Sequence, residues 1–404
     1  MMQVRAYIVN EAGKNLAKAC TITIRYSALR RQGYEEDGTT EKQILDYKQQ
    51  QHRLLPRLAA SYCFFFTGKK VLERLFDIES RLIQNKPVTK PEVADIHASS
   101  SSLKSYTTMF TADGLEDLRK ACGGHGFLMS SGLPELITTY LQNPTVEGDN
   151  HMLPQQVVKV LLKLVQAVQN GDDLTDYAAC DSYKLLPSLQ KIMSRETTRC
   201  PARNMDELLS LDVLHTAFEH RAARLLVEVA MQLQDRVSKG ASYTDAWNTC
   251  LIQMARVSRA YSQFLLLDNF WQGIRDSEGV LGAAEVSVLL DLLCLLAFYW
   301  MEGEIGDFLE DGYFTAEQAA WTREAVLHLL DVVRPNAVAL VDARDFPDFQ
   351  LKSALGRYDG DVYPAIMETA NRDPLNAGDI GPGYKEHLRR LIVGGVGAYT
   401  PSRL

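Results

Sequence analysis

A single carboxylate, Glu147, lies where the sequence predicts a sharp bend before a long helix. Gly148 follows it and lets the backbone turn tightly beside the side chain. The helix is predicted from apolar residues at steps of three and four, namely Leu153, Val157, Leu161, Leu164 and Val168. Asn150 is expected to cap this helix, and Pro154 fits only its first turn. A carboxylate held at such a bend can lose water and have its pKa tuned, which suits a general base, although a Glu–Gly pair before a helix is more often a solvated turn.

A second candidate segment, Cys122-Gly-Gly-His-Gly-Phe127, is predicted to end a helix in a glycine turn. Bare backbone amides at Gly123 and Gly124 can approach the phosphates of a ligand, although such a run is more often only a helix stop. His125 has two interpretations, a turn histidine bonded to backbone or a ligand contact. It is not expected to bind a metal, because no second histidine or cysteine stands at ligand spacing.

Two further polar residues, Arg30 and Gln51, are predicted to lie at the same end of a helix pair. Helices are expected over residues 4–32 and 42–75, and the short polar loop between them makes the pair antiparallel. From the residues alone, Arg30 is interpreted as an exposed helix-end cation and Gln51 as part of a solvated face. The first helix also holds small residues that allow close helix contact, namely Ala12, Gly13, Ala17 and Ala19.

The elements that must position these residues are all predicted to be helices. Further helices are expected over residues 92–120, 131–143, 211–229, 242–267, 283–301, 315–333 and 335–345. No stretch shows convincing alternation, so the predicted fold class is all-α, built as two antiparallel helical bundles. The polar run Asn170–Asp176 marks the boundary. The expected domains are residues 1–172, residues 173–393, and a flexible tail over residues 394–404.

Composition excludes some classes of function. The 404 residues are 46% hydrophobic and 23% charged, with a mean hydropathy of -0.15, which argues against long disorder. A net charge of -8 and a pI near 5.6 argue against non-specific nucleic-acid binding, yet permit a local site for an anionic ligand. The seven cysteines form no C-x-x-C pair, which is typical of reduced thiols in an intracellular protein.

Targeting signals are expected only at the carboxyl end. The amino terminus lacks the apolar core and cleavage site of a signal peptide. The most apolar run, residues 286–301, is too short to span a bilayer and carries Asp291, so a fully buried helix and no membrane span are expected. The last three residues, Ser402-Arg403-Leu404, differ from the peroxisomal address Ser-Lys-Leu by one basic-for-basic change, and the alternative is a chance match.

Taken together, these motifs resemble the carboxyl-terminal half of the peroxisomal acyl-CoA oxidases, within the acyl-CoA dehydrogenase and oxidase superfamily. The resemblance rests on the order and spacing of the motifs 25–32, 44–51 and 122–127, and of Glu147. Asp342-Ala-Arg-Asp-Phe346 and Leu355-Gly-Arg-Tyr-Asp-Gly360 extend it over nearly the whole chain.

The resemblance implies roles for individual residues. Glu147 matches the family's catalytic base, and Arg30 and Gln51 match an arginine and a glutamine that contact the flavin. Gly123, Gly124 and His125 match a turn that lies against the dinucleotide portion of FAD, often that of the partner subunit. Asn150 and Gln156 also match the flavin-contact pattern around the base. Lys48 stands where the family usually has glutamine, a small departure from the pattern. His151 and Asp149 stand where the family has threonine and glutamate, and these two changes affect the expected local flavin contacts but not the base itself.

The implied reaction is FAD-dependent oxidation of an acyl-CoA to a trans-2-enoyl-CoA, with oxygen reduced to hydrogen peroxide, in peroxisomal fatty-acid β-oxidation. Family members also carry an amino-terminal helical domain and a β domain that this sequence lacks. Three explanations remain open: a truncated gene product or fragment, a short paralogue that pairs with a complete subunit, and a helical scaffold without catalysis.

The expected partners are an acyl-CoA, a second copy or a full-length oxidase subunit, and a peroxisomal import receptor. The alternative function is a non-catalytic interaction subunit that pairs with a complete oxidase.

Overall fold

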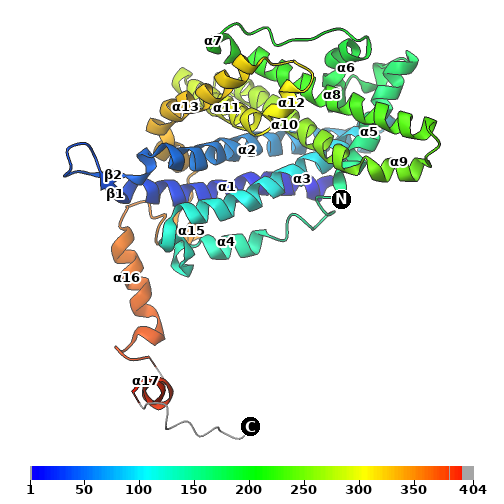
Figure 1. Ribbon diagram of the computed structural model, residues 1–404. Helices are drawn as coiled ribbons and strands as arrows, with labels where there is room; N and C mark the ends of the chain where they lie inside the picture. Colours follow the sequence, from blue (N-terminus) through cyan, green and yellow to red (C-terminus); the bar gives the residue numbers. More distant parts are fainter. Residues whose placement is uncertain (1, 382, 394–404) are drawn as a thin grey trace, which may run out of the picture.

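The computed structural model describes residues 2–381 and 383–393, and most of these residues are helical (Figure 1). The first half contains α1 (Met2–Leu29), β1 (Arg31–Tyr34), β2 (Glu41–Gln43), α2 (Lys48–Ile83), α3 (Lys90–Ala121), α4 (Leu133–Tyr140) and α5 (Leu153–Asn170). The second half contains α6 (Leu186–Met193), α7 (Met205–Leu208), α8 (Leu211–Ser238), α9 (Tyr243–Thr249), α10 (Leu251–Asp276), α11 (Ala283–Gly303), α12 (Ile305–Leu309), α13 (Ala316–Val333), α14 (Ala337–Asp342), α15 (Asp348–Leu351), α16 (Val362–Arg372) and α17 (Arg389–Val393). The all-α prediction is confirmed.

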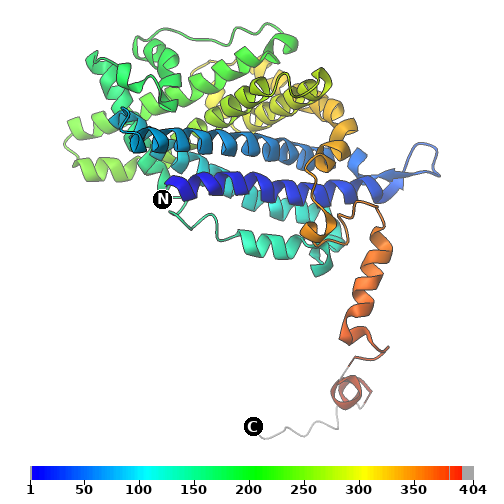
Figure 2. The same cartoon turned by 180° about the vertical axis from the view of Figure 1, so that it is seen from behind.

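The long helices α1 and α2 lie side by side, and α3 packs against both (Figures 1 and 2). Two glycines set the spacing of α1 and α2. A Cβ added to Gly13 would lie 2.9 Å from the backbone nitrogen of Phe65, and one added to Gly68 would lie 2.7 Å from Cα of Asn10. The predicted close contact through small residues is therefore confirmed at Gly13.

Replacing Gly68 with alanine is expected to lower the free energy of unfolding by about 1–3 kcal/mol, because the new methyl group overlaps the backbone of α1. Chemical denaturation followed by helical circular dichroism measures the change. Gly303→Ala is the matched control, because an added Cβ at this helix end meets no atom within 4 Å. The control is expected to be neutral or slightly stabilising, and an equal loss in both variants would contradict the close-contact explanation.

The polar connection between α1 and α2 is a short hairpin, and this differs from the predicted loop. The strands β1 and β2 are antiparallel, with Arg31 opposite Gln43 and Tyr34 opposite Glu41. The turn forms because the Asp37 carboxylate accepts the backbone N–H groups of Thr39 and Thr40. As a result, α2 begins at Lys48 and not near residue 42.

The two halves of the chain share one continuous hydrophobic cluster, which includes Leu16 and Leu103 from the first half and Phe264 and Leu296 from the second. Buried serines also join α3 to α10: the Ser102 hydroxyl lies 3.1 Å from the Ser258 carbonyl oxygen, to which it donates a hydrogen bond. The two halves therefore share one core, and the boundary near residue 172 stays a prediction.

Among the described residues, α11 is the one helix long and apolar enough to cross a membrane. It packs against α2, α10 and α13, and residues such as Leu292, Leu296 and Phe298 have no exposed surface. In this structure α11 is a core helix, but the predicted full burial of the run 286–301 is wrong, because Ser287 is exposed and Val286 and Asp291 are only partly buried.

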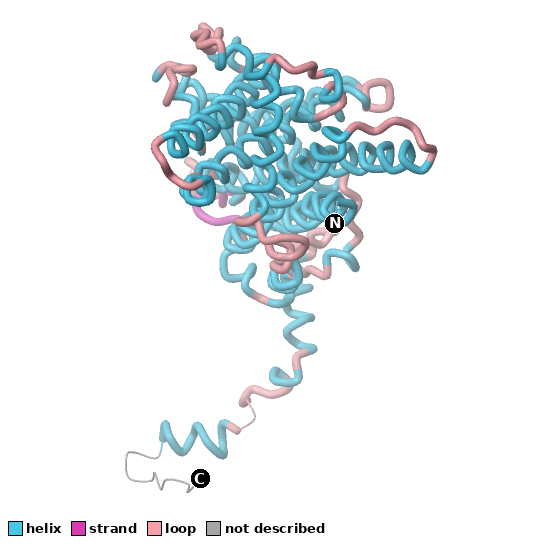
Figure 3. Tube along the Cα trace, turned by 90° about the vertical axis from the view of Figure 1, so that its right-hand side faces the viewer, coloured by secondary structure: helices cyan, strands magenta, loops and turns pink. Residues whose placement is uncertain are grey.

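The carboxyl-terminal part first returns to α1 and then leaves the bundle. Arg25 on α1 donates hydrogen bonds to the Asp342 carboxylate and to the Gly356 carbonyl oxygen. Beyond this contact, α16 and α17 extend away from the body (Figure 3). The tail over residues 394–404, including Ser402–Leu404, lies outside the described residues.

Candidate active site

The bend that carries Glu147 has an unusual backbone. Glu147 adopts φ +58°, in the left-handed region that side chains other than glycine rarely enter, and Gly148 follows with φ +113°. The backbone N–H of Asn150 closes the bend by donating to the Pro144 carbonyl oxygen at 3.0 Å. The helix α5 then begins at Leu153, close to where the sequence predicts it.

The predicted capping role of Asn150 is wrong. The residue before α5 is Met152, and its side chain makes no capping hydrogen bond. The Asn150 side chain is buried instead, because Lys104 donates to its oxygen at 3.0 Å and its nitrogen donates to the Thr108 hydroxyl at 2.9 Å. Both ends of the amide are engaged within the chain, so the predicted flavin contact by Asn150 would require one of these bonds to break.

The carboxylate of Glu147 is partly withdrawn from water. Glu147 is half-buried, and its Oε2 atom is buried without a hydrogen-bond partner among the described residues. An unpaired buried carboxylate oxygen is costly, so such an atom is expected to serve as an acceptor for a ligand or a proton. The desolvated setting predicted for a base at this bend is therefore present on this side of the carboxylate.

Two cationic side chains donate hydrogen bonds to the backbone of the bend. Arg5 on α1 donates from Nε to the Glu147 carbonyl oxygen at 2.9 Å, and Lys104 on α3 donates from Nζ to the Gly148 carbonyl oxygen at 2.7 Å. Burial, together with the nearby Arg5 charge, lowers the pKa of Lys104 to about 8, although the Asp149 and Glu147 carboxylates oppose the shift. Sequence reasoning missed both cations, although Lys104 is the one residue of Lys, Arg, Asp or Glu type between Asp95 and Asp113.

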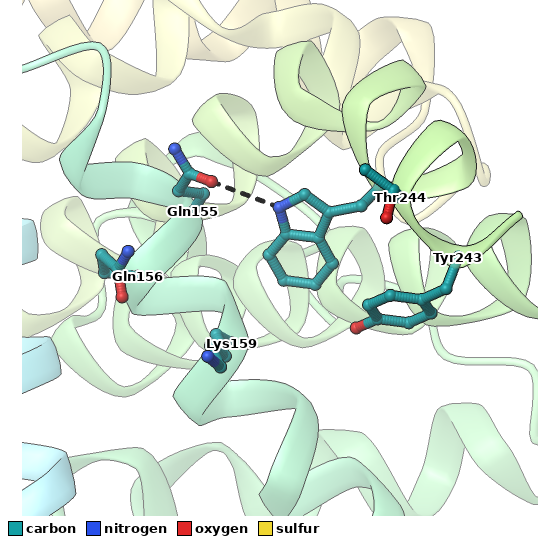
Figure 4. Close-up of a pocket in the computed structure, with 6 residues that line it drawn as sticks. Gln155, Gln156, Lys159, Tyr243 and Thr244 are labelled. Carbon is teal, nitrogen blue, oxygen red and sulfur yellow. Dashed lines mark hydrogen bonds between the residues drawn. The ribbon is translucent and has the colours of Figure 1, made fainter.

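Gln156 is exposed on the first turns of α5, beside a small cavity of about 250 Å³ between α5 and α9. Gln155 accepts a hydrogen bond from the indole N–H of Trp247 at 3.3 Å across this cavity (Figure 4). Lys159, Tyr243 and Thr244 complete the lining. Gln156 thus lies at the same end of the molecule as Glu147.

A second cavity, of about 470 Å³, lies at the other end of α1. Its lining includes the predicted residues Arg30, Gly123, Gly124 and His125, together with Tyr26, Gln32, Ile44, Gln50, Lys120, Ala121 and Cys122. A Cβ added to Gly123 or Gly124 would meet no atom within 4 Å, so the turn faces open space that a ligand can occupy. The structure thus brings four predicted contact residues together.

Hydrogen bonds orient the polar side chains of this cavity. The Tyr26 hydroxyl lies 2.7 Å from His125 Nδ1, and burial raises the pKa of Tyr26 to about 12, which keeps the hydroxyl protonated. Arg30 donates from Nη1 to the Tyr363 hydroxyl at 3.2 Å. Sequence reasoning missed Tyr363, which comes from α16, more than 300 residues beyond Arg30. Its only sequence signal is that it follows the motif 355–360.

Gln51 lies at this end of the helix pair, as predicted, but its side chain does not line the cavity. Gln51 is 3% exposed and its Oε1 atom is buried without a partner among the described residues, so the prediction of a solvated face is wrong. Successive residues of a helix point about 100° apart, and it is Gln50 that faces the cavity. A flavin contact by Gln51 therefore stays a prediction.

Comparison with known proteins identifies the family. Residues 1–162 match the model of the "Acyl-CoA oxidase, C-alpha1 domain", and residues 210–393 match the "Acyl-CoA oxidase" model. The chain belongs to the acyl-CoA oxidase family. It is 38% identical over 393 residues to peroxisomal acyl-coenzyme A oxidase 1 of Mus musculus, covering 97% of this chain and 58% of that protein. It is equally identical, over 396 residues, to the Arabidopsis thaliana protein of the same name, covering 97% and 56%.

Solved acyl-CoA oxidase structures share the fold. Acyl-CoA oxidase 1 of Arabidopsis thaliana aligns with a TM-score of 0.85 and 37% identity, over 98% of this chain and 57% of that chain. Acyl-CoA oxidase-2 of Caenorhabditis elegans, described as bound with FAD, ascaroside-CoA and ATP, aligns with a TM-score of 0.87 and 30% identity, over 99% and 57%. This oxidase-family chain therefore spans just over half the length of the relatives it matches, and the names of the curated relatives support a peroxisomal location.

In this acyl-CoA oxidase family chain, the predicted site residues form two separate groups. Arg5, beside Glu147, and Arg30, in the larger cavity, are 25 residues apart along a helix that rises 1.5 Å per residue, so about 37 Å separates the groups. Figure 1 shows the two ends of α1 on opposite sides of the molecule. One chain therefore does not assemble all the predicted residues into a single site.

Proposed function

We propose that this chain is the carboxyl-terminal, catalytic-base-bearing part of an FAD-dependent acyl-CoA oxidase of peroxisomal fatty-acid β-oxidation. The substrate is an acyl-CoA, and the products are a trans-2-enoyl-CoA and hydrogen peroxide. The observation that supports this most directly is the buried, unpartnered Oε2 atom of Glu147 on a left-handed bend. The acyl-CoA oxidase-2 structure described with FAD and an ascaroside-CoA supports the cofactor and the substrate class.

Glu147 removes the proton from the carbon next to the thioester in this proposal. That proton is only weakly acidic, so the base must be close to it and poorly solvated. The electrons of the broken C–H bond form the α,β double bond as a hydride leaves the next carbon. Bound FAD would supply the acceptor for that hydride and the route by which the electron pair reaches oxygen. The Glu147 carboxylate holds the α-proton until it is released to water.

The larger cavity suits the phosphate portion of a dinucleotide. Arg30 and Lys120 supply positive charge, and the open turn at Gly123 and Gly124 lets backbone amides approach phosphate oxygens. Because about 37 Å separates this cavity from Glu147, the two groups serve different flavins. We therefore place each flavin between the Glu147 end of one subunit and the Arg30 end of its neighbour, which is a second copy or a full-length oxidase subunit.

Flavin binding tests this proposal against the alternative of a non-catalytic interaction subunit. The purified chain, alone and mixed with a full-length oxidase subunit, is incubated with FAD, gel-filtered and examined for flavin absorbance. Peroxide release after adding an acyl-CoA is then measured. A chain that binds flavin by itself, or that raises peroxide release above that of the full-length subunit alone, supports the oxidase. A colourless folded chain that binds the full-length subunit without raising its peroxide release supports the interaction subunit. Removal of Ser402–Leu404 from a tagged chain separately tests whether the import receptor recognises this tripeptide, because the truncated chain should then fail to enter peroxisomes.

Replacing Arg30 with alanine is expected to weaken FAD retention by about 10- to 100-fold, because one charge-assisted hydrogen bond to the cofactor is lost. The dissociation constant is measured by flavin fluorescence in the assembly that binds FAD. Arg31→Ala is the matched control, since Arg31 is exposed and donates to the Glu41 carbonyl oxygen within the hairpin. Equal weakening in both variants would point to damage to the hairpin and not to a contact by Arg30.

A further inference from the structure

The backbone at Glu147 needs support from outside the bend. A residue with a side chain in the left-handed region is strained, and such strain persists only where surrounding contacts hold it. Within the bend, the hydrogen bond that closes over residues 147 and 148 joins the Asn150 backbone N–H to the Pro144 carbonyl oxygen. Whatever holds the two residues 147 and 148 therefore decides where the Glu147 carboxylate points.

Two cations bind the two successive carbonyl oxygens at this point. Arg5 Nε lies 2.9 Å from the Glu147 oxygen, and Lys104 Nζ lies 2.7 Å from the Gly148 oxygen. Hydrogen bonds from charged donors are shorter and stronger than neutral ones. Because each bond engages one peptide plane, the pair restrains φ and ψ of Gly148, which lie between the two planes, and the Arg5 bond also fixes the peptide plane that directly follows Glu147.

Both cations are themselves anchored in the bundle. Arg5 is 5% exposed and also donates to the Ser101 hydroxyl at 2.9 Å, with His97 Nε2 at 3.3 Å. Lys104 has no exposed surface and also donates to the Asn150 side chain. The bend is thus attached to two long, buried helices, α1 and α3, although it lies in the connection between α4 and α5.

Burying two cations is costly, and neither is offset by a direct ion pair. Among the described residues, the side chains of Arg5 and Lys104 donate to carbonyl, hydroxyl, amide or imidazole groups, and no carboxylate lies within ion-pair distance of either. The Glu147 and Asp149 carboxylates favour these charges only from beyond ion-pair distance, so burial of the two cations beside the bend brings no gain from packing alone. The burial of these two cations is explained if the bend must keep one backbone geometry.

We propose that Lys104 and Arg5 are positioning residues, which hold the left-handed bend and thereby aim the Glu147 carboxylate at the substrate. This inference rests on the proposed role of Glu147 as the base. Preorganised placement matters for such a group, because a displacement of about 1 Å can cost about 10²-fold in rate. The two cations touch the backbone of the base and act on the reaction only through it.

Amide hydrogen exchange in the full 404-residue chain tests the positioning role directly. In Lys104→Met, the backbone amides of Asn150 and Leu153 are expected to exchange about tenfold faster or more, because the bend opens locally, while amides in α13 are unchanged. Lys163→Met, an exposed lysine on α5, is the matched control and should leave all rates within about twofold. Arg5→Met should speed exchange at the same amides. Arg5→Lys, which keeps a hydrogen-bond donor, should leave their exchange rates close to those of the wild type.

Turnover in a peroxide-releasing assembly supplies the second readout. Lys104→Met is expected to lower kcat by about 10- to 100-fold with KM within about threefold and with flavin absorbance retained. Unchanged exchange at the bend, while Glu147→Gln abolishes turnover, would overturn the positioning role and leave the base in place. If Lys104→Met speeds exchange at the bend but Glu147→Gln leaves turnover unchanged, Glu147 is not the base. The proposal that the two cations aim a catalytic base would then also be overturned.

Discussion

Replacing Glu147 with glutamine is expected to lower acyl-CoA turnover by about 10²- to 10⁴-fold, the usual contribution of a positioned general base. Glutamine keeps the size of the side chain but cannot accept the α-proton at neutral pH. Because the residues proposed to contact the flavin are unchanged, FAD absorbance should be retained. Peroxide release from a saturated acyl-CoA, normalised to bound flavin, measures the effect.

Two comparisons make this result specific. Glu135→Gln changes an exposed carboxylate on α4, whose partner is the exposed Lys352, and should leave turnover within about twofold. Glu147→Asp keeps the carboxylate but shortens its reach, so its rate should fall between those of the wild type and Glu147→Gln. If Glu147→Gln retains full turnover in an assembly that binds FAD, Glu147 is not the base.

Replacing Arg221 with methionine is expected to lower the free energy of unfolding by about 3 kcal/mol or more, because a fully buried ion pair loses one partner. Arg221 on α8 is 1% exposed and donates to the Asp307 carboxylate at 2.7 Å. Arg256 also contacts Asp307, so the carboxylate is not left wholly unpaired. Urea denaturation followed by circular dichroism measures the change. Arg236→Met, an exposed arginine on the same helix, should change stability by less than about 0.5 kcal/mol.

This loss should depend on pH. Burial acts to raise the pKa of Asp307, but Arg221 and Arg256 outweigh burial and hold the pKa below its usual value of 3.8. The stability that comes from the ionised carboxylate is therefore present above that value and is lost as the pH falls through the lower, folded-state pKa. The difference between wild type and Arg221→Met should be largest near neutral pH and should narrow in acid. A constant difference would show that lost packing, and not the ion pair, causes the destabilisation.

The helices and their main contact could be predicted because their signals are local. Apolar spacing along residues 153–168 predicts a helix that the structure places over Leu153–Asn170. Gly13 predicts a close approach, and the structure places the backbone of Phe65 against it. The glycine turn at residues 122–127 and the bend at Gly148 are likewise properties of short segments, since glycine favours such conformations wherever it occurs.

Other features could not be predicted because they depend on contacts between distant residues or on the rotation of one helix. The difference between Gln50 and Gln51 is a rotation of about 100° about α2, which the packing of that helix determines. Asn150 is a good capping residue by type, yet Lys104, 46 residues earlier, draws its side chain into the core. The Asn150 side chain cannot both cap α5 and bind Lys104, and in this structure it binds Lys104.

By itself, the sequence determined the all-α class, the family and the identity of the candidate base, because periodicity, glycine position and motif order are all encoded along the chain. Only the tertiary structure decided that Arg5 meets Glu147 across 142 positions and that Tyr363 meets Arg30 across 333. The tertiary structure also separated the candidate base from the larger cavity by the length of α1. The physical reason is that side-chain hydrogen bonds act over about 3 Å, so their partners are set by how the helices pack and not by their order in the chain.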